Sequence, residues 1–558
     1  MFNPQNPLII QSNSTILLEV NNPLFVDARN AISQFAHLDK SPEYIHTYTI
    51  TALSLWNAAA LGLTSDEVLK RLEAYSKYPL PQNVAQDISE LMGRFGKITL
   101  ESVSEGLAIC SQDTQMLQNL CKHPMVKPLL GKAHNQNSFL VPAQNRGLLK
   151  QVLISIGYPA HDKAGYVDGD PFPIDLRSET KGGEPFNVRT YQHQAAENFI
   201  GNKESPGGSG VVVLPCGAGK TIVGILAMSL LKRRTLILVT NVTAARQWRR
   251  EILDKTTIDE KDIGEYSGEL KEIKPVTLAT YQILTYRRKK SDIFVHYDIF
   301  NSENWGLILY DEVHLLPAPI FKFTADIQAR RRLGLTATLI REDGHENDVF
   351  TLIGPKKFDM PWKDLEKQGW IACATCVEIR IDLPAAEKMR FLSLTPKQQI
   401  RLAYENPNKL DVIEELIETH KEDQVLIIGQ YISQLEQVAT RFNTAIITGA
   451  TPNKKREELF NAFRAGEIKV LVLSKVGNFA IDLPDANIAI QISGSFGSRQ
   501  EEAQRLGRIL RPKKKGEQAT FYSIVTRESK ELDFAMNRQL FLTEQGYSYE
   551  IQYRESDN

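Results

Sequence analysis

Cysteine is scarce in this chain of 558 residues, with only five in total. Such scattered residues cannot form a disulfide framework, and we expect the protein in a reducing compartment, the cytoplasm. Cys373 and Cys376 do form a C-x-x-C pair, but no second pair at zinc-site spacing is nearby. We therefore interpret these two cysteines as small residues of a strand.

Long apolar runs are also missing. The nearest approach, residues 51–63, contains Thr, Ser and Asn and is shorter than the ~20 residues that span a bilayer. The first basic residue is Arg29, so the basic start of a secretory leader is absent. We expect no membrane association and no export.

An excess of charge of either sign is missing as well. The 66 Lys and Arg nearly balance the 67 Asp and Glu, which leaves a net charge of −1. Charge alone therefore neither favours nor excludes a nucleic-acid partner. Any groove that binds phosphates must be a local feature.

The length suggests three or four domains at ~150 residues each. Residues 158–186 are rich in Gly and Pro and mark a boundary, so residues 1–184 are predicted as a mixed, helix-rich accessory region. Within it we expect a helix that Ser65 caps, a second helix over 84–95 and a strand over 97–100. This order fits either a winged helix-turn-helix, which binds nucleic acid, or a plain helical hairpin.

Short β-branched runs alternate with helical stretches beyond Arg189, which predicts two α/β blocks in sequence. Continuous apolar runs of this kind suit parallel sheets that are covered on both faces. We expect one domain over 185–360, a connector with a helical insertion over 361–408, and a second domain over 409–558. The predicted strands lie at 211–214, 235–239, 276–279, 307–310 and 333–335, then at 425–428, 445–447, 469–473, 488–490 and 520–525.

Residues 215–221, Pro-Cys-Gly-Ala-Gly-Lys-Thr, carry the strongest local signal. They lie between a predicted strand and an apolar helix, where backbone N–H groups and the helix dipole can hold phosphate oxygens. Gly217, Ala218 and Gly219 keep this loop small. Lys220 can then reach the β- and γ-phosphates of ATP, and Thr221 can bind Mg²⁺. Leu214 stands where the strict form of the motif has glycine.

Asp311 and Glu312 directly follow the predicted strand at 307–310. A carboxylate at such a strand end can hold the Mg²⁺ that bridges the phosphates, and its neighbour can orient and deprotonate the attacking water. We assign the metal to Asp311 and the base to Glu312.

Phosphoryl transfer also needs cationic charge on the departing phosphate. Arg505, Arg508 and Arg511 are spaced three residues apart in the second block, so they lie on successive turns of a predicted helix. Leu506 and Leu510 between them indicate a packed helix rather than a solvated basic face.

Taken in order, these blocks resemble superfamily-two helicases, and among them the XPB-type DNA helicases of the bacterial and archaeal branch. The blocks that carry the resemblance are 189–192, 215–221, 311–314, 336–338, 474–477 with 482–484, and 504–511. Arg-Glu-Asp at 341–343, Asn-Pro-Asn-Lys at 406–409 and Gln-Gly-Tyr-Ser at 545–548 narrow it to XPB. The resemblance covers residues 186–558 firmly and the N-terminal third more weakly. It implies two tandem RecA-like domains after the N-terminal region.

The resemblance also implies roles for particular residues. Gln192 would read the adenine, with Arg189 beside it, and Arg508 and Arg511 would be the arginine fingers. Thr336 and Thr338 would couple nucleotide state to the grip on DNA. Arg341, Glu342 and Asp343 would act at the DNA junction during strand separation. Asn478 stands where relatives often have an acidic residue.

The resulting hypothesis is an ATP-dependent DNA helicase or translocase of 3′–5′ polarity that acts in DNA repair, with ATP and Mg²⁺ as cofactors. The polarity, a damage-recognition role for the N-terminal region, a repair-nuclease partner and a monomeric state rest on the resemblance. Clusters at 246–250 (Arg-Gln-Trp-Arg-Arg) and 286–290 (Tyr-Arg-Arg-Lys-Lys) can contact a nucleic-acid backbone, or be solvated surface. Two alternatives stay open, an RNA helicase and a nucleotide-gated scaffold that recruits a repair nuclease without unwinding.

Overall fold

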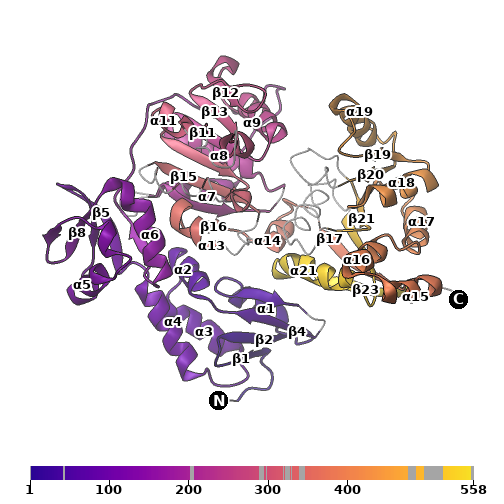
Figure 1. Ribbon diagram of the computed structural model, residues 1–558, viewed down its shortest axis with the longest axis horizontal. Coiled ribbons are helices and arrows are strands. Elements are labelled where there is room, and N and C mark those ends of the chain that lie inside the picture. The colour runs from indigo at the N-terminus through magenta and orange to yellow at the C-terminus, as the bar shows by residue number, and fades with distance from the viewer. Residues whose placement is uncertain are drawn as a thin grey trace. The chain divides into compact units, whose positions relative to one another are not determined.

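A computed structural model of the chain forms two compact units. The first contains residues 1–214 and 219–359, and the second contains residues 215–218 and 360–558 (Figure 1). The structure describes residues 2–41, 44–201, 207–215, 217–287, 295–296, 298–317, 320, 324, 327, 330–337, 346–371, 373–474, 486–494 and 519–554. None of the helices within these ranges has the length and apolar composition needed to cross a bilayer.

The chain begins with a four-stranded antiparallel sheet of order β1-β2-β4-β3 and four helices. Thr64, not Ser65 as predicted, caps α3, because its Oγ1 accepts from Glu67 N at 3.3 Å while the Glu67 carboxylate accepts from Thr64 N at 2.8 Å. The elements are β1 (Leu8–Ile10), β2 (Thr15–Glu19), α1 (Phe25–Ile32), β3 (His37–Lys40), β4 (Ile45–Thr49), α2 (Ala52–Ala60), α3 (Ser65–Tyr75) and α4 (Gln82–Arg94).

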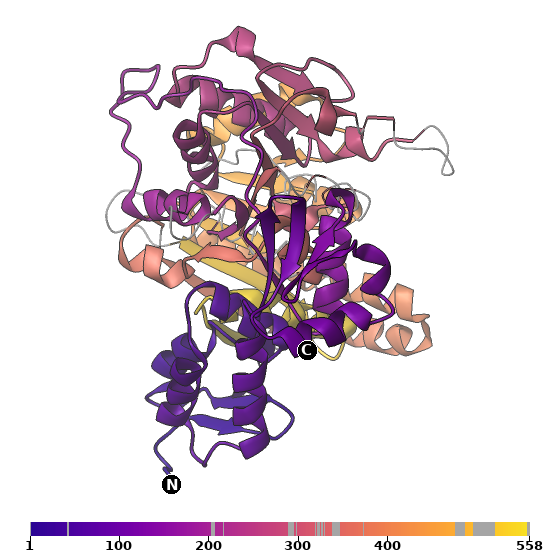
Figure 2. The same cartoon turned by 90° about the vertical axis from the view of Figure 1, so that its left-hand side faces the viewer.

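A five-stranded sheet of order β7-β8-β6-β5-β9 follows, and its strands face the viewer in Figure 2. The predicted strand after α4 exists as β5, and it pairs antiparallel with β6 and parallel with β9. The two helices and the strand are therefore confirmed, while the strand belongs to a larger sheet than a winged helix would need. The elements are β5 (Ile98–Val103), β6 (Gly106–Cys110), α5 (Thr114–Lys122), β7 (Ala133–Asn135), β8 (Ser138–Val141), α6 (Arg146–Ser155) and β9 (Ala160–Asp162).

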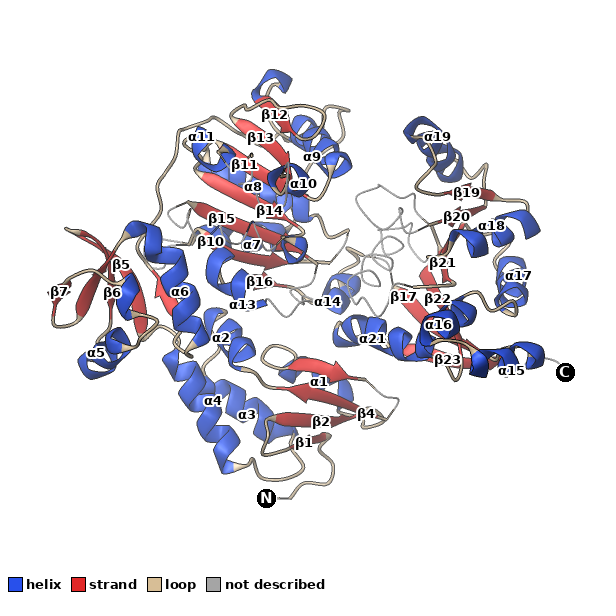
Figure 3. Ribbon diagram, in the orientation of Figure 1, coloured by secondary structure: helices blue, strands red, loops and turns tan. Residues whose placement is uncertain are grey.

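Seven parallel strands form the first RecA-like sheet, in the order β12-β13-β11-β14-β15-β10-β16. Its central strands are buried along their whole length because helices cover both faces of the sheet (Figure 3). Its elements, in chain order, are α7 (Thr190–Ile200), β10 (Ser209–Val213), α8 (Lys220–Leu231), β11 (Thr235–Val239), α9 (Val242–Lys255), β12 (Ile263–Tyr266), β13 (Val276–Thr280), α10 (Tyr281–Leu284), α11 (Ile299–Ser302), β14 (Leu307–Asp311), β15 (Arg331–Thr336), α13 (Glu346–Asp348), a π-helical turn (Val349–Ile353) and β16 (Lys356–Asp359).

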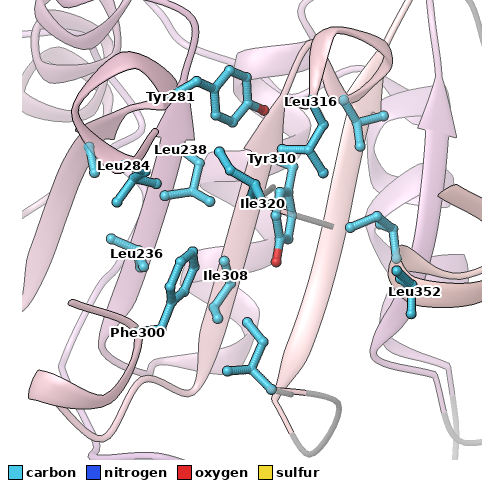
Figure 4. Packing of buried hydrophobic residues seen from close by; sticks show 14 of the residues in the cluster. Leu236, Leu238, Tyr281, Leu284, Phe300, Ile308, Tyr310, Leu316, Ile320 and Leu352 are labelled. Atoms are coloured by element: carbon cyan, nitrogen blue, oxygen red, sulfur yellow. The ribbon is translucent and has the colours of Figure 1, made fainter. Parts of the chain in front are cut away.

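One hydrophobic core holds this sheet against its helices. Side chains from β11 and β14, such as Leu238 and Tyr310, pack with Phe300 and Ile320 from the flanking segments (Figure 4). Trp305 is also fully buried in this core. A rigid core of this kind fixes the carboxyl ends of the strands, where the candidate active site lies.

The second unit contains a parallel sheet of the same size, in the order β19-β20-β18-β21-β22-β17-β23. Strand β17, within the range expected as a connector, lies inside this sheet between β22 and β23. It contains Cys376, which confirms the strand reading of that cysteine. The elements are α14 (Trp362–Lys367), β17 (Ala374–Ile381), α15 (Ala385–Ser393), α16 (Pro396–Tyr404), α17 (Lys409–Thr419), β18 (Val425–Ile428), α18 (Ile432–Arg441), β19 (Ala445–Ile447), α19 (Asn453–Arg464), β20 (Val470–Leu473), β21 (Ile488–Gln491), β22 (Ala519–Thr526), α21 (Lys530–Glu544) and β23 (Tyr549–Arg554).

Candidate active site

The loop between β10 and α8 has the backbone of a phosphate-binding turn. Gly217 and Gly219 have φ values of 81° and 80°, a left-handed conformation that favours glycine. A Cβ at Gly219 would lie 2.4 Å from Gln192 Nε2, so a larger residue there would displace this amide. Lys220 is the first residue of α8 and Thr221 the second, which places both at the positive end of the helix dipole.

Gln192 lies buried in the first turn of α7. Its Oε1 accepts a hydrogen bond from Arg189 N at 2.9 Å, and Arg189 Nη1 donates to the Tyr191 hydroxyl at 2.9 Å. Sequence reasoning expected Arg189 and Gln192 side by side, and the two residues are joined by these contacts. The Gln192 amide also adjoins the loop through Gly219.

Lys220 and Glu312 form the central ion pair of the site. Lys220 Nζ lies 3.5 Å from Glu312 Oε1, and both side chains are mostly buried. Glu312 has a φ of 49°, a left-handed conformation that is unfavourable for a residue with a Cβ. Burial by itself would raise the pKa of Glu312, but the charges of Lys220 and His314 outweigh burial and hold that pKa below its ordinary value.

Asp311, the last residue of β14, is held by two aromatic residues that sequence reasoning did not assign to the site. Trp248 Nε1 donates to Asp311 Oδ2 at 2.9 Å, and the Tyr281 hydroxyl donates to the Asp311 carbonyl at 2.7 Å. Burial, followed by the neighbouring Glu312 carboxylate, raises the pKa of Asp311 to about 6. Trp248 belongs to the cluster at 246–250, for which nucleic-acid contact and solvated surface were both left open, and its side chain is only 2% exposed.

His314 connects the acidic pair to the next strand. Its Nδ1 lies 2.7 Å from Thr336 Oγ1 and 3.4 Å from Glu312 Oε2. Thr336 is the last residue of β15 and is fully buried. Side chains from β14 and β15 thus meet at the carboxyl ends of adjacent strands.

Lys220, Asp311, Glu312 and Thr336 therefore gather at one edge of the sheet, as the strand order requires. Six predicted site residues lie outside the described residues: Thr338, Arg341, Glu342, Asp343, Arg508 and Arg511. Arg505 and Asn478 lie outside them too. A tryptophan on the buried side of an amphipathic helix after a sheet strand is the signal that would have found Trp248.

Three family models match the chain. Residues 365–557 match the ERCC3/RAD25/XPB C-terminal helicase, residues 185–341 match the type III restriction enzyme res subunit, and residues 8–135 match a helicase conserved C-terminal domain. The "DNA 3'-5' helicase XPB" of Mycobacterium tuberculosis is 50% identical over 553 residues, which cover 99% of this chain and 98% of the relative. The chain belongs to the XPB family of DNA 3′–5′ helicases.

Two further XPB proteins are similar to this chain over nearly its whole length. The protein from Kineococcus radiotolerans is 52% identical over 98% of this chain and 96% of its own length. In Saccharomyces cerevisiae, a "General transcription and DNA repair factor IIH helicase/translocase subunit XPB/SSL2" is 30% identical over 97% of this chain and 71% of the relative. The XPB likeness therefore includes the N-terminal third, where sequence motifs alone left it weak.

The predicted helicase class is thus confirmed. The chain is an ATP-dependent DNA 3′–5′ helicase or translocase of DNA repair, built on two RecA-like parallel sheets. DNA rather than RNA is the substrate class of these relatives.

Proposed function

We propose that the Lys220–Glu312 pair is the ATP-hydrolysing centre of this DNA helicase. The observation that carries the proposal is the 3.5 Å approach of Lys220 Nζ to Glu312 Oε1 at the N-terminus of α8. When ATP enters, Lys220 turns from this carboxylate to the β- and γ-phosphates. Glu312 is then free to orient the attacking water and to take its proton.

Gly217, Ala218 and Gly219 surround the phosphates in this proposal, and Gln192 reads the adenine with Arg189 beside it. The close approach of Gln192 Nε2 to Gly219 supports this assignment, because it places the amide next to the loop. In this proposal Thr336 responds to whether nucleotide is bound, because His314 connects it to the acidic pair. His314 Nδ1 lies 2.7 Å from Thr336 Oγ1.

Mg²⁺ fits the oxygen donors of the site. A carboxylate and a hydroxyl are ligands that this hard cation prefers, and Asp311 and Thr221 offer them. Burial and the Glu312 carboxylate raise the pKa of Asp311, and a nearby cation would favour its charged form. When bound, Mg²⁺ would neutralise charge on the phosphates, and Asp311 and Thr221 would hold it.

Further roles rest on the sequence. Arg508 and Arg511 serve as arginine fingers, and Thr338 assists Thr336. Arg341, Glu342 and Asp343 separate the strands at duplex–single-strand junctions, so changing all three to Ala should keep ATPase activity but abolish strand displacement. If the variant with all three residues changed to Ala still separates DNA strands, the triplet has no part in strand separation.

The chain is also proposed to work as a monomer in the cytoplasm together with a repair nuclease, and its N-terminal region is proposed to bind damaged DNA.

The substitution Glu312→Gln tests whether the Lys220–Glu312 pair hydrolyses ATP. Glu312→Gln should bind ATP normally and hydrolyse it about 10²–10⁴-fold more slowly, because an amide cannot accept the proton. Lys220→Ala should lose turnover together with nucleotide affinity. Glu269→Gln is a matched control, because Glu269 is exposed and pairs with Arg246 at the surface. Hydrolysis by Glu312→Gln at the parent rate would show that another group is the base.

A further inference from the structure

A cavity with both apolar and charged lining residues lies within the first unit, away from the Lys220–Glu312 site. Its volume is 210 Å³, far more than the roughly 10–15 Å³ that a single water needs. Residues at the starts of β10 and β16 line it, together with residues of α2, α6 and β9. Figure 1 shows α2 and α6 beside β16 and α13. Since all strands of the sheet are parallel, this edge is opposite the one that carries Asp311 and Thr336.

The charged groups that line the cavity are two lysines, Lys150 and Lys357, and the carboxylate of Asp162. The lining includes Lys150, His161, Asp162, Tyr166, Ser209 and Lys357. Among the lining residues that the structure describes, Asp162 is the one carboxylate. The Asp162 carboxylate already accepts hydrogen bonds from two cations. Arg146 donates two of them, at 2.7 and 3.0 Å, and Lys150 Nζ donates a third at 3.2 Å.

A third buried cation, Arg332, lies behind the same wall. The Arg332 guanidinium is 5.7 Å from the ring centre of Tyr166, and the Arg146 guanidinium is 5.6 Å from it. The Tyr166 hydroxyl donates to Ser209 Oγ at 2.8 Å. Tyr166 therefore joins the N-terminal region to β10 of the RecA-like sheet, and two guanidinium groups lie near its ring.

Lys357 of β16 is the second lysine in the lining of the cavity. The aliphatic part of the Lys357 side chain packs against the backbone of Gly210. A Cβ added at Gly210 would lie 2.3 Å from Lys357 Cγ. In the described part of the chain, no carboxylate forms an ion pair with Lys357, and burial lowers its pKa. Its neighbour Lys356 instead pairs with Asp359 at 2.5 Å. The two adjacent lysines of β16 thus have different surroundings.

The positive charge around the cavity exceeds the negative charge that Asp162 supplies. Burial lowers the pKa of Lys150 to about 8 even though Asp162 opposes this change, and Arg332 and Arg146 add to it. Lysine side chains at a partly closed cavity, with further guanidinium groups behind its wall, are the chemistry that binds phosphate oxygens. A bound oxyanion would balance the excess charge.

We propose that this cavity is a binding site for a small phosphate-type anion, separate from the nucleotide site, at the junction of the N-terminal region and the first RecA-like sheet. Lys357 and Lys150 contact the anion, while Arg146 and Arg332 hold Asp162 and Tyr166 in place. Binding stabilises the junction, because the ligand contacts residues of both parts. The cavity is too confined for a duplex, so the phosphate belongs to a free ion or a mononucleotide.

The test follows the thermal unfolding midpoint of the full chain as inorganic phosphate is added. Saturating ADP occupies the nucleotide site, and chloride at matched ionic strength corrects for screening. Phosphate should raise the midpoint of the parent and of Lys356→Met beyond the chloride control. In Lys357→Met the phosphate concentration needed for the same rise should increase at least tenfold. The midpoints of the two variants without phosphate show whether both are folded.

Two further arms identify the source of the phosphate. Thymidine monophosphate should act like inorganic phosphate, and the affinity for a single-stranded oligonucleotide should be the same in Lys357→Met as in the parent. An equal phosphate response in Lys357→Met, or a parent response no larger than with chloride, overturns the site. Weaker oligonucleotide binding in Lys357→Met with an unchanged phosphate response also overturns it, and assigns Lys357 to DNA.

Discussion

At the scale of single residues, the backbone at Glu312 holds the site in a strained form. Left-handed φ values at a residue with a Cβ cost about 1–3 kcal/mol, which the surrounding structure must offset. At Glu312, the turn aims the carboxylate at Lys220, and His314 lies behind it. The strain is therefore located where the proposed chemistry takes place.

Trp248 is expected to position Asp311 through its single N–H. Trp248→Phe keeps most of the packing but removes the hydrogen bond to Asp311 Oδ2. A hydrogen bond to a charged group contributes about 1.5–3 kcal/mol, so ATPase kcat/KM should fall roughly 10- to 100-fold. Trp305→Phe is the matched control, because Trp305 is buried in the same domain but donates to Ile299 O. If Trp248→Phe and Trp305→Phe lose the same activity, Trp248 contributes through packing and not through its hydrogen bond to Asp311.

Asp162 is expected to make stability depend on pH. Burial raises its pKa, but Lys150 and Arg146 outweigh burial and hold the pKa at about 2, against 3.8 for an ordinary Asp. The carboxylate thus stabilises the fold fully above pH 3.8 and less as the pH falls toward 2. Asp162→Asn should cost about 3–5 kcal/mol of unfolding free energy at pH 7. In urea unfolding, this difference between parent and variant should shrink between pH 4 and 2; a constant difference would contradict the assignment.

At the scale of elements, the position of α8 depends on a glycine in its middle. A Cβ at Gly224 would lie 2.6 Å from Trp248 Cη2 and 3.3 Å from Leu335 Cδ1. The glycine therefore allows α8 to approach both α9 and β15. Since Lys220 begins α8, this close packing also places the lysine next to Glu312.

The same substitution at two helical glycines should have opposite effects. Gly224→Ala overpacks the contact with Trp248 and should lower the unfolding free energy by about 1–3 kcal/mol, with weaker nucleotide binding. Gly93→Ala in α4 has open space around the new Cβ and should stabilise by up to about 1 kcal/mol through helix propensity. Chemical denaturation and nucleotide titration of both variants measure this. If both substitutions raise the unfolding free energy, α8 can move away from Trp248 without losing stability.

At the scale of the whole molecule, the chain carries two compact units, each with its own parallel sheet and core. The first unit supplies Lys220, Asp311 and Glu312. The arginines proposed to act on the departing phosphate belong to the second part of the sequence. Hydrolysis should therefore need both parts, while nucleotide binding should need mainly the first.

A fragment of residues 1–359 tests this division. It should bind ATP with near-parent affinity, because the loop and Lys220 are present. Its turnover should be about 10³–10⁵-fold lower, the usual effect of losing an arginine finger. Arg508→Ala in the full chain should reproduce the loss, which separates it from a folding defect of the fragment. A fragment with parent-like turnover would mean that the first unit holds a complete site.

The amino-acid sequence was sufficient to identify the helicase family and the central strands of both sheets, and it predicted the residues of the candidate site. Those strands were predictable because they are buried on both faces and so are continuously apolar, as in β11 and β18. The loop at 215–221 and the pair Asp311–Glu312 were predictable because their chemistry requires fixed residue types at strand ends.

The remaining features became visible only in the folded chain, because they depend on contacts between residues that are distant in sequence. The outer strands β12, β16 and β23 were missed, since they mix polar and apolar residues. Strand β17 was anticipated only around its cysteine and not as a member of the sheet, since its apolar run contains Glu378, which is buried and stabilised by Arg380 and by Gln539 from α21. Likewise Trp248 meets Asp311 from 63 residues away, and Lys150 meets Lys357 around one cavity. No local pattern records such pairings, because the backbone path alone brings those side chains together.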